Sequence, residues 1–151
     1  MKNYLLLFFC SVFFILNSCS ENEETIESKT PISVQQIGKG DLVGNNIPQQ
    51  NTVITTSTQW TALLTNLDAS HNISGGFTET NIDFNHFMVI AVFDEVFPNG
   101  GHSIDIMTVD ENAQNIEVDV EKLLQGNVTT VVTQPYHIVK IPKSSKPVIF
   151  Q

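Results

Sequence analysis

One unbroken run of seven apolar residues decides the fold: Phe87-Met88-Val89-Ile90-Ala91-Val92-Phe93. Neither side of this run alternates to polar residues, as a half-exposed strand would. Its length suits a strand that lies in the interior of a sheet. We therefore predict a central strand at residues 87–93 that is buried on both of its faces.

Two segments downstream alternate between apolar and polar residues, which is typical of strands with one buried face. They are residues 102–107 and 116–121, and a turn at 110–115 separates them. We expect their apolar residues to face one another on a buried side: Ile104, Ile106, Ile116, Val118 and Val120. We expect the carboxylates between them to face water: Asp105, Glu117, Asp119 and Glu121.

The C-terminal third contains three further candidate strands, at residues 128–133, 137–141 and 148–150. Pro135 lies between the first two. Proline has no amide hydrogen to donate to a neighbouring strand, so we expect a bulge or a sheet edge at this residue. Two turn signals separate the strands, Phe97-Pro98-Asn99-Gly100-Gly101 and Gln125-Gly126-Asn127.

The residues before the central run predict two weaker strands and one helix. Residues 33–44 are a weak strand candidate, and 52–56 are short and β-branched. The spacing then becomes helical over 58–67, where apolar residues form one stripe: Trp60, Leu63, Leu64 and Leu67. We expect Ser57 or Thr58 to cap this helix and Trp60 to anchor it in the core.

Together these segments predict a mainly β (α+β) protein with a single domain at residues 33–151. A chain of 151 residues is long enough to bury one core. We expect about six to eight short strands and one short helix, arranged as a sandwich or a barrel-like domain. The pattern of residues does not give the order of the strands.

The first 18 residues resemble a lipoprotein signal peptide. Lys2 precedes an apolar run at 5–16, which is too short for a bilayer span of about 20 residues. The run ends in Leu16-Asn17-Ser18-Cys19, which resembles the bacterial lipobox, although Asn17 stands where Ala, Ser, Thr or Val is usual. We expect cleavage after residue 18 and lipidation of Cys19, with two acyl chains that anchor the protein stably.

Residues 19–32 are predicted to form a flexible tether, because they are polar and acidic and have no apolar periodicity. An acidic stretch after a lipidated cysteine also resembles the surface-export signal of Bacteroidetes lipoproteins. A solvated spacer would have the same composition. We therefore expect an outer-membrane lipoprotein on either the periplasmic or the cell-surface face.

The composition excludes some partners and some chemistry. Seven basic residues, all lysines, stand against sixteen carboxylates, and the formal net charge is −9 at pH 7. A nucleic-acid-binding protein needs a basic surface, so we expect no nucleic acid as a partner. Cys10 is removed with the predicted signal, which leaves Cys19 as the mature chain's only cysteine and excludes an intramolecular disulfide.

No motif of the sequence predicts catalysis or a cofactor. The four histidines do not occur at metal-ligand spacing, and no nucleophile elbow or phosphate-binding loop is found. Asp94 and Glu95 are adjacent carboxylates, but neighbours on a strand point to opposite faces, so we expect them to be solvated. We expect His102 and His137 to be partly buried and hydrogen-bonded. We predict no catalytic residues, no metal and no other cofactor.

Two motifs in the last third resemble a known family. They are Gly100-Gly101-His102-Ser103-Ile104-Asp105-Ile106 and Gln134-Pro135-Tyr136-His137-Ile138-Val139-Lys140-Ile141-Pro142-Lys143. With the hairpin between them, they are similar to the C-terminal domain of PrcB-type subunits; PrcB is a lipoprotein subunit of a spirochaete surface protease complex. The resemblance extends over residues 52–151, and His102 stands where the family usually has tyrosine. It implies non-enzymatic support of a protease or another partner.

A looser similarity is to chagasin-type cysteine-protease inhibitors, which present two loops from a β-sandwich. Residues 98–102 and Pro135-Tyr136 are similar to those loops, although the family's Thr and Trp are missing. Glycine leaves room for close approach and tyrosine is frequent at binding hot spots, so we predict these partner-binding residues: Gly100, Gly101, His102, Pro135, Tyr136 and His137. The alternative is that both motifs form only a turn and a bulge, with the tyrosine in the core.

Three functions are consistent with the sequence. The first is a lipid-anchored, non-enzymatic accessory protein of the cell envelope, which docks on or stabilises a protease or another envelope protein. The second is a chagasin-like protease inhibitor that acts through the Gly-Gly and Pro-Tyr loops. The third is a carbohydrate-binding module or an enzyme of unrecognised type. An exposed row of aromatic side chains in a groove would favour carbohydrate binding.

Overall fold

The computed structural model describes residues 28–44 and 47–151. The predicted signal peptide, Cys19 and most of the predicted tether therefore lie outside the described residues. Within these ranges, no helix is long and apolar enough to cross a membrane. The elements are, in chain order, β1 (Thr30–Pro31), β2 (Gln35–Leu42), β3 (Gln50–Ile54), α1 (Ser57–Leu67), the 3-10 turn η1 (Ser74–Gly76), β4 (Phe87–Phe93), β5 (Asp105–Glu111), β6 (Ile116–Glu121), β7 (Gln134–Pro142) and β8 (Val148–Phe150).

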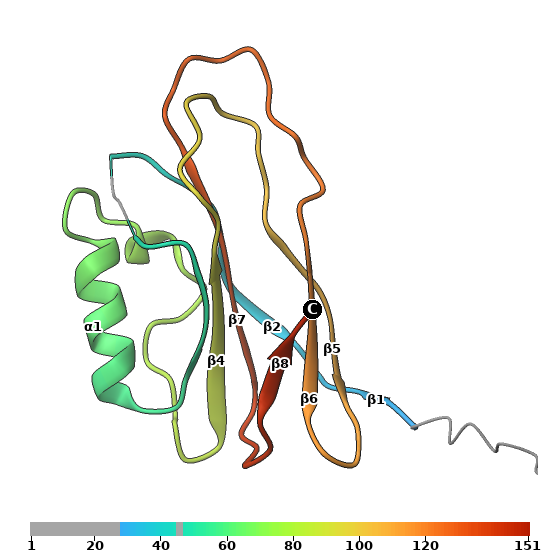
Figure 1. Ribbon diagram of the computed structural model, residues 1–151. Coiled ribbons are helices and arrows are strands. Elements are labelled where there is room, and N and C mark those ends of the chain that lie inside the picture. Colours follow the sequence, from blue (N-terminus) through green and yellow to red (C-terminus); the bar gives the residue numbers. More distant parts are fainter. Residues whose placement is uncertain (1–27, 45–46) are drawn as a thin grey trace, which may run out of the picture.

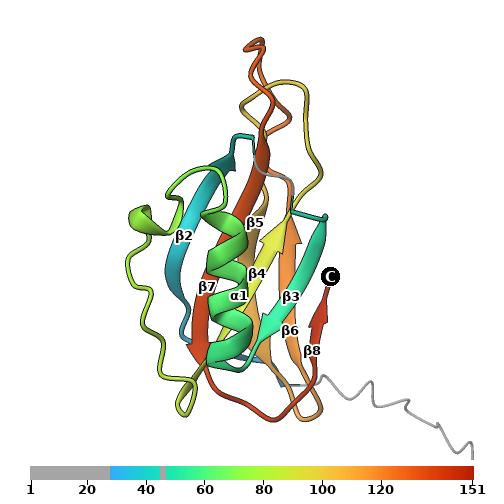
Figure 2. The ribbon, with the colours of Figure 1, turned by 90° about the vertical axis from the view of Figure 1, so that its left-hand side faces the viewer.

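The strands form two four-stranded sheets that face each other, and α1 covers the outer face of one of them (Figures 1 and 2). The sheet under the helix has the order β2-β7-β4-β3, and the other has the order β1-β5-β6-β8. Because β1 pairs with β5, the second sheet begins inside the range predicted as tether. The predicted fold class is confirmed: the described chain is mainly β with one α-helix, and its two open sheets make it a sandwich.

The central apolar run forms β4, which lies between β7 and β3 and is buried on both faces. Val89, Ala91 and Phe93 pack in the core under α1. The residues that alternate with them pack in a second core between the two sheets: Met88, Ile90 and Val92. Each face of β4 is covered by another layer, which is why neither face alternates to polar side chains. The prediction for residues 87–93 is confirmed.

The predicted helix is confirmed as α1, and so is the predicted role of Trp60. Trp60 is buried, and its indole N–H donates at 2.8 Å to a backbone carbonyl of the loop that leads to β4. The cap differs from the prediction, because the N-cap is Thr56 and not Ser57 or Thr58. The Thr56 hydroxyl accepts a hydrogen bond from the backbone N–H of Gln59 at 3.3 Å.

The predicted bulge or edge at Pro135 is wrong. Pro135 lies inside β7, which begins at Gln134 and occupies the interior of its sheet between β2 and β4. The Pro135 carbonyl accepts the N–H of Asp94 at 3.0 Å, and the side-chain amide of Gln134 donates to the Asp94 carbonyl at 2.8 Å. That amide supplies the hydrogen bond that proline cannot donate. The register shift in the β2–β7 pair lies on β2, between Gln36 and Gly38.

The strand predicted at residues 128–133 is also wrong, because these residues form a connection outside both sheets. Thr133 alone makes a β-bridge there, with Phe97. Val128 is 99% exposed. β-branched residues favour a strand only where a neighbouring strand covers and pairs with them, and here the sheets have already ended.

The predicted hairpin is confirmed, with a bulge and with different bounds for its first strand: β5 covers Asp105–Glu111, whereas 102–107 was predicted. The expected apolar residues lie in the core between the sheets, Val120 at its margin: Ile104, Ile106, Ile116, Val118 and Val120. The register shifts between Ile106 and Thr108, which leaves Met107 exposed and turns Val109 into the core. The bulge thereby reverses the alternation in the second half of β5.

Asp105 does not face water as predicted; it is buried. Its carboxylate accepts hydrogen bonds from the Lys39 ammonium and from the Ser103 hydroxyl, the latter at 2.5 Å. Burial alone would raise the pKa of Asp105, but the hydrogen bonds from Lys39 and Ser103 outweigh it and lower the pKa. The carboxylate therefore stays ionised between the two sheets and links β2 to β5.

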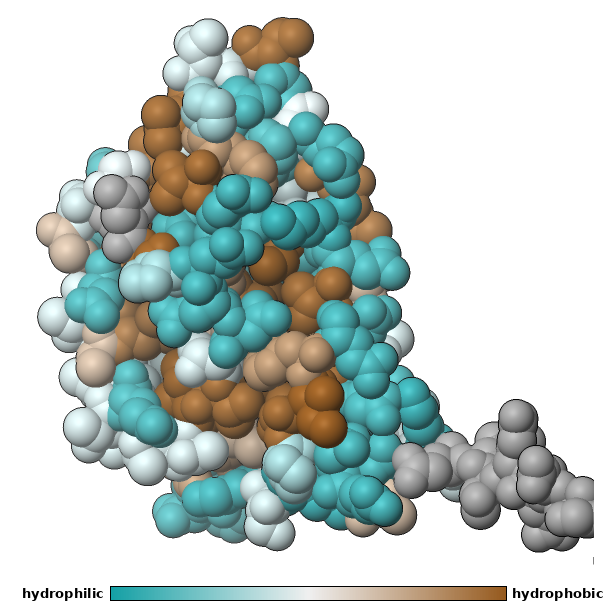
Figure 3. Space-filling model, viewed as in Figure 1, coloured by the Kyte–Doolittle hydropathy of each residue, from teal (hydrophilic) through white to brown (hydrophobic). Residues whose placement is uncertain are grey.

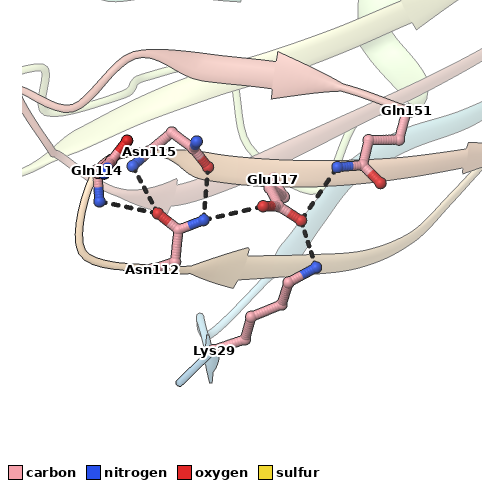
Figure 4. A network of polar contacts seen from close by, with 6 residues as sticks. All are labelled: Lys29, Asn112, Gln114, Asn115, Glu117 and Gln151. Carbon is pink, nitrogen blue, oxygen red and sulfur yellow. Dashed lines mark hydrogen bonds and ion pairs between the residues drawn. The ribbon is translucent and has the colours of Figure 1, made fainter. Parts of the chain in front are cut away.

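A polar network closes the turn between β5 and β6 (Figure 4). Asn112 is buried, and its Oδ1 accepts the backbone N–H groups two and three residues further on, each at 2.8 Å. Its Nδ2 donates to Glu117 at 2.9 Å. Glu117 also accepts hydrogen bonds from Lys29 and Gln151. The hydrogen bond from Lys29 is the main cause of the lowered pKa of Glu117. The network thus fastens both margins of this sheet to its central hairpin.

Candidate partner-binding site

Two long connections extend beyond the sheets at the same end of the molecule, at the top of Figure 1. They are residues 94–104, between β4 and β5, and residues 122–133, between β6 and β7, and together we call them the loop end. Phe97 and Thr133 exchange two backbone hydrogen bonds, of 2.8 and 3.0 Å. The carbonyls of Gly100 and Gly101 accept two more, at 2.8 and 3.0 Å. The Gly100-Gly101 turn and the connection that leads into Pro135-Tyr136 therefore lie at the same end of the fold.

The predicted Gly100-Gly101 turn shapes the loop end from within. Gly101 has a φ of +79°, and a Cβ at this position would overlap the side chain of Asn127. Gly126 on the opposite connection has a φ of +94°, and a Cβ there would overlap His102. Both positions require the left-handed backbone that glycine adopts without strain. The glycines allow the two connections to pack directly on each other.

His102 is half-buried and hydrogen-bonded, as predicted. Its ring stacks on Phe97, with centroids 3.7 Å apart and planes at 7°. Its Nε2 lies 3.1 Å from Oδ1 of Asn99. The ring therefore acts as a platform inside the first connection, held on one face by an aromatic neighbour and at its edge by an amide.

The other three predicted site residues, Pro135, Tyr136 and His137, are buried in β7. The Tyr136 ring packs in the core under α1, with its centroid 6.2 Å from that of Phe77 and 6.3 Å from that of Phe93. Burial raises the pKa of the Tyr136 phenol. A partner could reach these side chains only by opening the sheet, so the structure places them inside the fold and not on its surface.

His137 joins the two sheets. Its Nδ1 accepts the backbone N–H of Ile106 at 2.9 Å, and Ile106 belongs to the opposite sheet. Burial, and after it the positive charge of Lys39, lower the pKa of His137 to about 4 against the opposing effect of Asp105. The imidazole is therefore neutral at pH 7, which its role as hydrogen-bond acceptor requires.

Asp94, predicted to be solvated, is fully buried at the base of the loop end. One carboxylate oxygen accepts the N–H of Glu95 at 2.7 Å, lies 2.7 Å from Nζ of Lys122, and is 3.3 Å from the amide nitrogen of Gln49. Asp94 thus ties the start of one connection to the start of the other. Among the described residues, no group of three or more His, Cys, Asp or Glu side chains is placed to hold a metal ion.

The loop end also exposes aliphatic side chains that the sequence did not reveal. Six of the ten large hydrophobic side chains exposed on the described residues lie there, and we call them the aliphatic patch: Val96, Leu123, Leu124, Val128, Val131 and Val132. Figure 3 shows hydrophobic surface at this end of the molecule. Concentrated exposed apolar surface marks sites of interaction with proteins or membranes. Three of the six, Val128, Val131 and Val132, fall in the range predicted as a strand, 128–133, where burial and not exposure is expected.

A comparison with protein families bears on this same part of the chain. Residues 88–142 match the family model PrcB C-terminal. The resemblance predicted from the sequence is thereby confirmed for this segment, which extends from β4 to the end of β7 and contains the whole loop end. No curated protein and no solved structure matches the chain.

Proposed function

We propose that this protein is a lipid-anchored, non-enzymatic accessory protein of the bacterial cell envelope, which docks on a protease or another envelope protein through its loop end. The observation that carries the proposal is the aliphatic patch, which lies within the segment that matches the PrcB C-terminal model. The PrcB resemblance supplies the kind of partner, a protease complex. The patch supplies the surface that such a partner would cover.

Docking at the patch is physically favourable. Each valine or leucine that passes from water into an interface contributes about 1.5–3 kcal/mol when it is buried completely. The two connections are joined by backbone hydrogen bonds and by the ion pair between buried Asp94 and exposed Lys122, so little ordering is needed before a partner binds. The folded chain gains little from these side chains while they remain in water.

The lipid anchor in this proposal is supported by residues near the start of the sequence. Leu16-Asn17-Ser18-Cys19 has the form of a lipobox, and Cys19 is the only cysteine after residue 18. We expect Cys19→Ala to abolish metabolic labelling with palmitate and to release the protein from membranes. Continued labelling of the variant would contradict lipidation at this residue.

The two alternative functions have less support. A chagasin-like inhibitor would present a Pro-Tyr loop, but Pro135 and Tyr136 are buried inside β7. A carbohydrate-binding groove is usually lined by exposed aromatic rings. The large hydrophobic side chains that the described residues expose are all aliphatic or methionine.

The proposal is tested by placing charges in the patch. Val128→Asp combined with Val131→Asp should abolish recovery of a protease or other envelope protein cross-linked to the full-length chain in its own cells. The matched control is Val34→Asp with Val43→Asp, two exposed valines outside the loop end. It carries the same added charge and should recover the partner at the wild-type level.

Equal recovery by the two double variants would contradict docking through the loop end. Where the recovered partner is a protease, its turnover with and without the accessory chain separates support from inhibition. We expect the protease to remain active and to survive longer in the complex. Loss of turnover on binding would instead favour the inhibitor.

A further inference from the structure

The two sheets have four edge strands, and three of them are protected from pairing with another chain. β1 has two residues, one of which is Pro31, and β8 has three residues. β2 contains a bulge and two charged residues, and Thr78 donates backbone and hydroxyl hydrogen bonds to its carbonyls at 2.8–2.9 Å. Short length, proline, charge, bulges and coverage are the usual means of blocking an edge.

The fourth edge strand, β3, has none of these protections. Its sequence Gln50-Asn51-Thr52-Val53-Ile54 contains no charge and no proline, and its pairing with β4 is regular over all five residues. It is the last strand of its sheet (Figure 2). In the part of the chain that the structure describes, no hydrogen bond is made to the outer side of Asn51 or Val53.

The register shows which peptide groups of β3 point outward. The N–H of Asp94 bonds to β7, so alternation along β4 turns the peptide groups of Phe93 and Ala91 toward β3. Their partners on β3 are Gln50 and Thr52, which therefore belong to the ladder. The residues between and after them, Asn51 and Val53, direct their N–H and C=O groups away from the sheet.

Two clefts lie on either side of this edge. The cleft on the α1 side has a volume of about 270 Å³ and is lined by Ile54, Ala62 and Leu63 among others. The cleft toward the other sheet has a volume of about 280 Å³. Four amide side chains, among them Asn51 and Gln151, line it together with three apolar side chains and Lys122. Successive residues of a strand point to opposite faces, so a strand added at β3 would place alternate side chains in the two clefts.

We propose that the outer edge of β3 binds an extended peptide segment of a partner protein by strand addition. The segment has aliphatic side chains at every second position, directed into the cleft beside α1, and neutral polar side chains at the others, directed toward the amides. Its backbone pairs with the N–H and C=O groups of Asn51 and Val53. No residue of the aliphatic patch lines either cleft, so this site goes beyond the function proposed above.

The probe is the capped peptide acetyl-Lys-Thr-Val-Thr-Ile-Thr-Val-Thr-Lys-amide, titrated into the full chain. We expect it to bind and to protect the amides of Asn51 and Val53 from hydrogen exchange. Asn51→Pro removes an outward N–H that the β3–β4 ladder does not use, and should weaken binding roughly tenfold or more. Asn51→Ala removes the same side chain but keeps that N–H, and should therefore bind the peptide more tightly than Asn51→Pro does.

A second experiment uses the wild-type protein and a modified peptide. The same peptide with N-methyl groups on alternate residues of its pairing edge keeps its charge and side chains, and should not bind. Absence of binding by the unmodified peptide, equal binding by Asn51→Pro, or protection at another edge would overturn the proposal. A wild-type dimer that Asn51→Pro converts to a monomer would assign the edge to a second copy and would overturn it as well.

The two proposals can fail independently. Val128→Asp with Val131→Asp should leave binding of the probe peptide unchanged, because the aliphatic patch lies on the connections outside the sheets. Loss of peptide binding in that variant would mean that the peptide occupies the loop end. If the same variant loses partner recovery but still binds the peptide, the loop end and the edge of β3 are two independent binding sites.

Discussion

Residues 88–93 of β4 and the loop end lie within the same matched segment, residues 88–142, yet the two regions are stabilised in different ways. β4 is an interior strand whose side chains are covered by α1 on one face and by the second sheet on the other. The loop end lies outside both sheets and leaves six aliphatic side chains in water. The first region is stabilised by burial of apolar surface, and the second by hydrogen bonds and by glycine conformations.

We interpret the difference as one between residues that build the fold and residues that, under the proposed function, contact a partner. The Val and Ile residues of β4 are completely buried, whereas the valines of the loop end are exposed and so contribute little to the free energy of folding. Exposed aliphatic residues add nothing to the stability of the free protein and increase its tendency to aggregate. Their concentration on one end therefore supports the proposal that a partner covers this surface.

The largest expected effect lies in the core. Phe93→Ala removes a fully buried ring that packs on Tyr136, and should lower the free energy of unfolding by about 3–5 kcal/mol. Val96→Ala, three positions further along at an exposed residue, should change it by less than about 0.5 kcal/mol. Urea denaturation of both variants measures the contrast. Similar losses in the two would show that the loop end is as much a part of the core as β4.

The next effect concerns His137, which links the sheets. Its pKa is about 4 in the folded protein and near 6.5 in an unfolded chain, so the unfolded state binds more protons between these values. Stability should therefore fall as the pH drops from about 6.5 to 4, by about 3 kcal/mol in total.

A matched variant isolates this histidine from the carboxylates. His137→Asn keeps an acceptor for the N–H of Ile106 but does not titrate, so its stability should be flat over the same pH range. Asp105, Glu117 and the other carboxylates with lowered pKa lose their contribution at lower pH, below their ordinary values. An unchanged pH slope in His137→Asn would mean that another group is responsible.

The sequence predicted those elements in which a local pattern and the tertiary environment agree. The run at 87–93 and the helical stripe through Trp60 are of this kind, since burial of their apolar residues is itself the structural outcome. The PrcB resemblance was found for the same reason, because its motifs lie next to or within such strands.

The failures have a common physical origin in long-range partners. Pro135 sits in an interior strand because the side chain of Gln134 replaces the missing N–H by donating to the carbonyl of Asp94, 40 residues before Gln134 in the chain. Asp105 is buried because Lys39, far away in the chain, reaches it. The valines at 128–133 carry a strand pattern, but no strand lies beside them. None of these partners is visible in the spacing of neighbouring residues.

A smaller effect is expected at the glycine that lets the two connections meet. Gly101→Ala places a Cβ at a φ of +79° and against Asn127, and should cost about 1–3 kcal/mol. Hydrogen exchange should show the loss locally, as faster exchange of the Gly126 and Asn127 amides that bond to the first connection. Exchange that is unchanged at these amides would show that the glycine pair is not what holds the loop end together.

The smallest effect on stability, and the most informative one, is expected at the tip of the loop end. Val128 is 99% exposed, so Val128→Ala should alter the free energy of unfolding by no more than about 0.5 kcal/mol. A side chain that serves a partner should nevertheless weaken that partner's binding when it is shortened, because the interface loses apolar area that the free fold never buried. Recovery of the cross-linked partner and urea denaturation, measured on the same variant, give the two quantities. A loss of stability above about 1 kcal/mol would mean that Val128 packs on the fold in solution, and the contrast between β4 and the loop end would then not separate folding from docking.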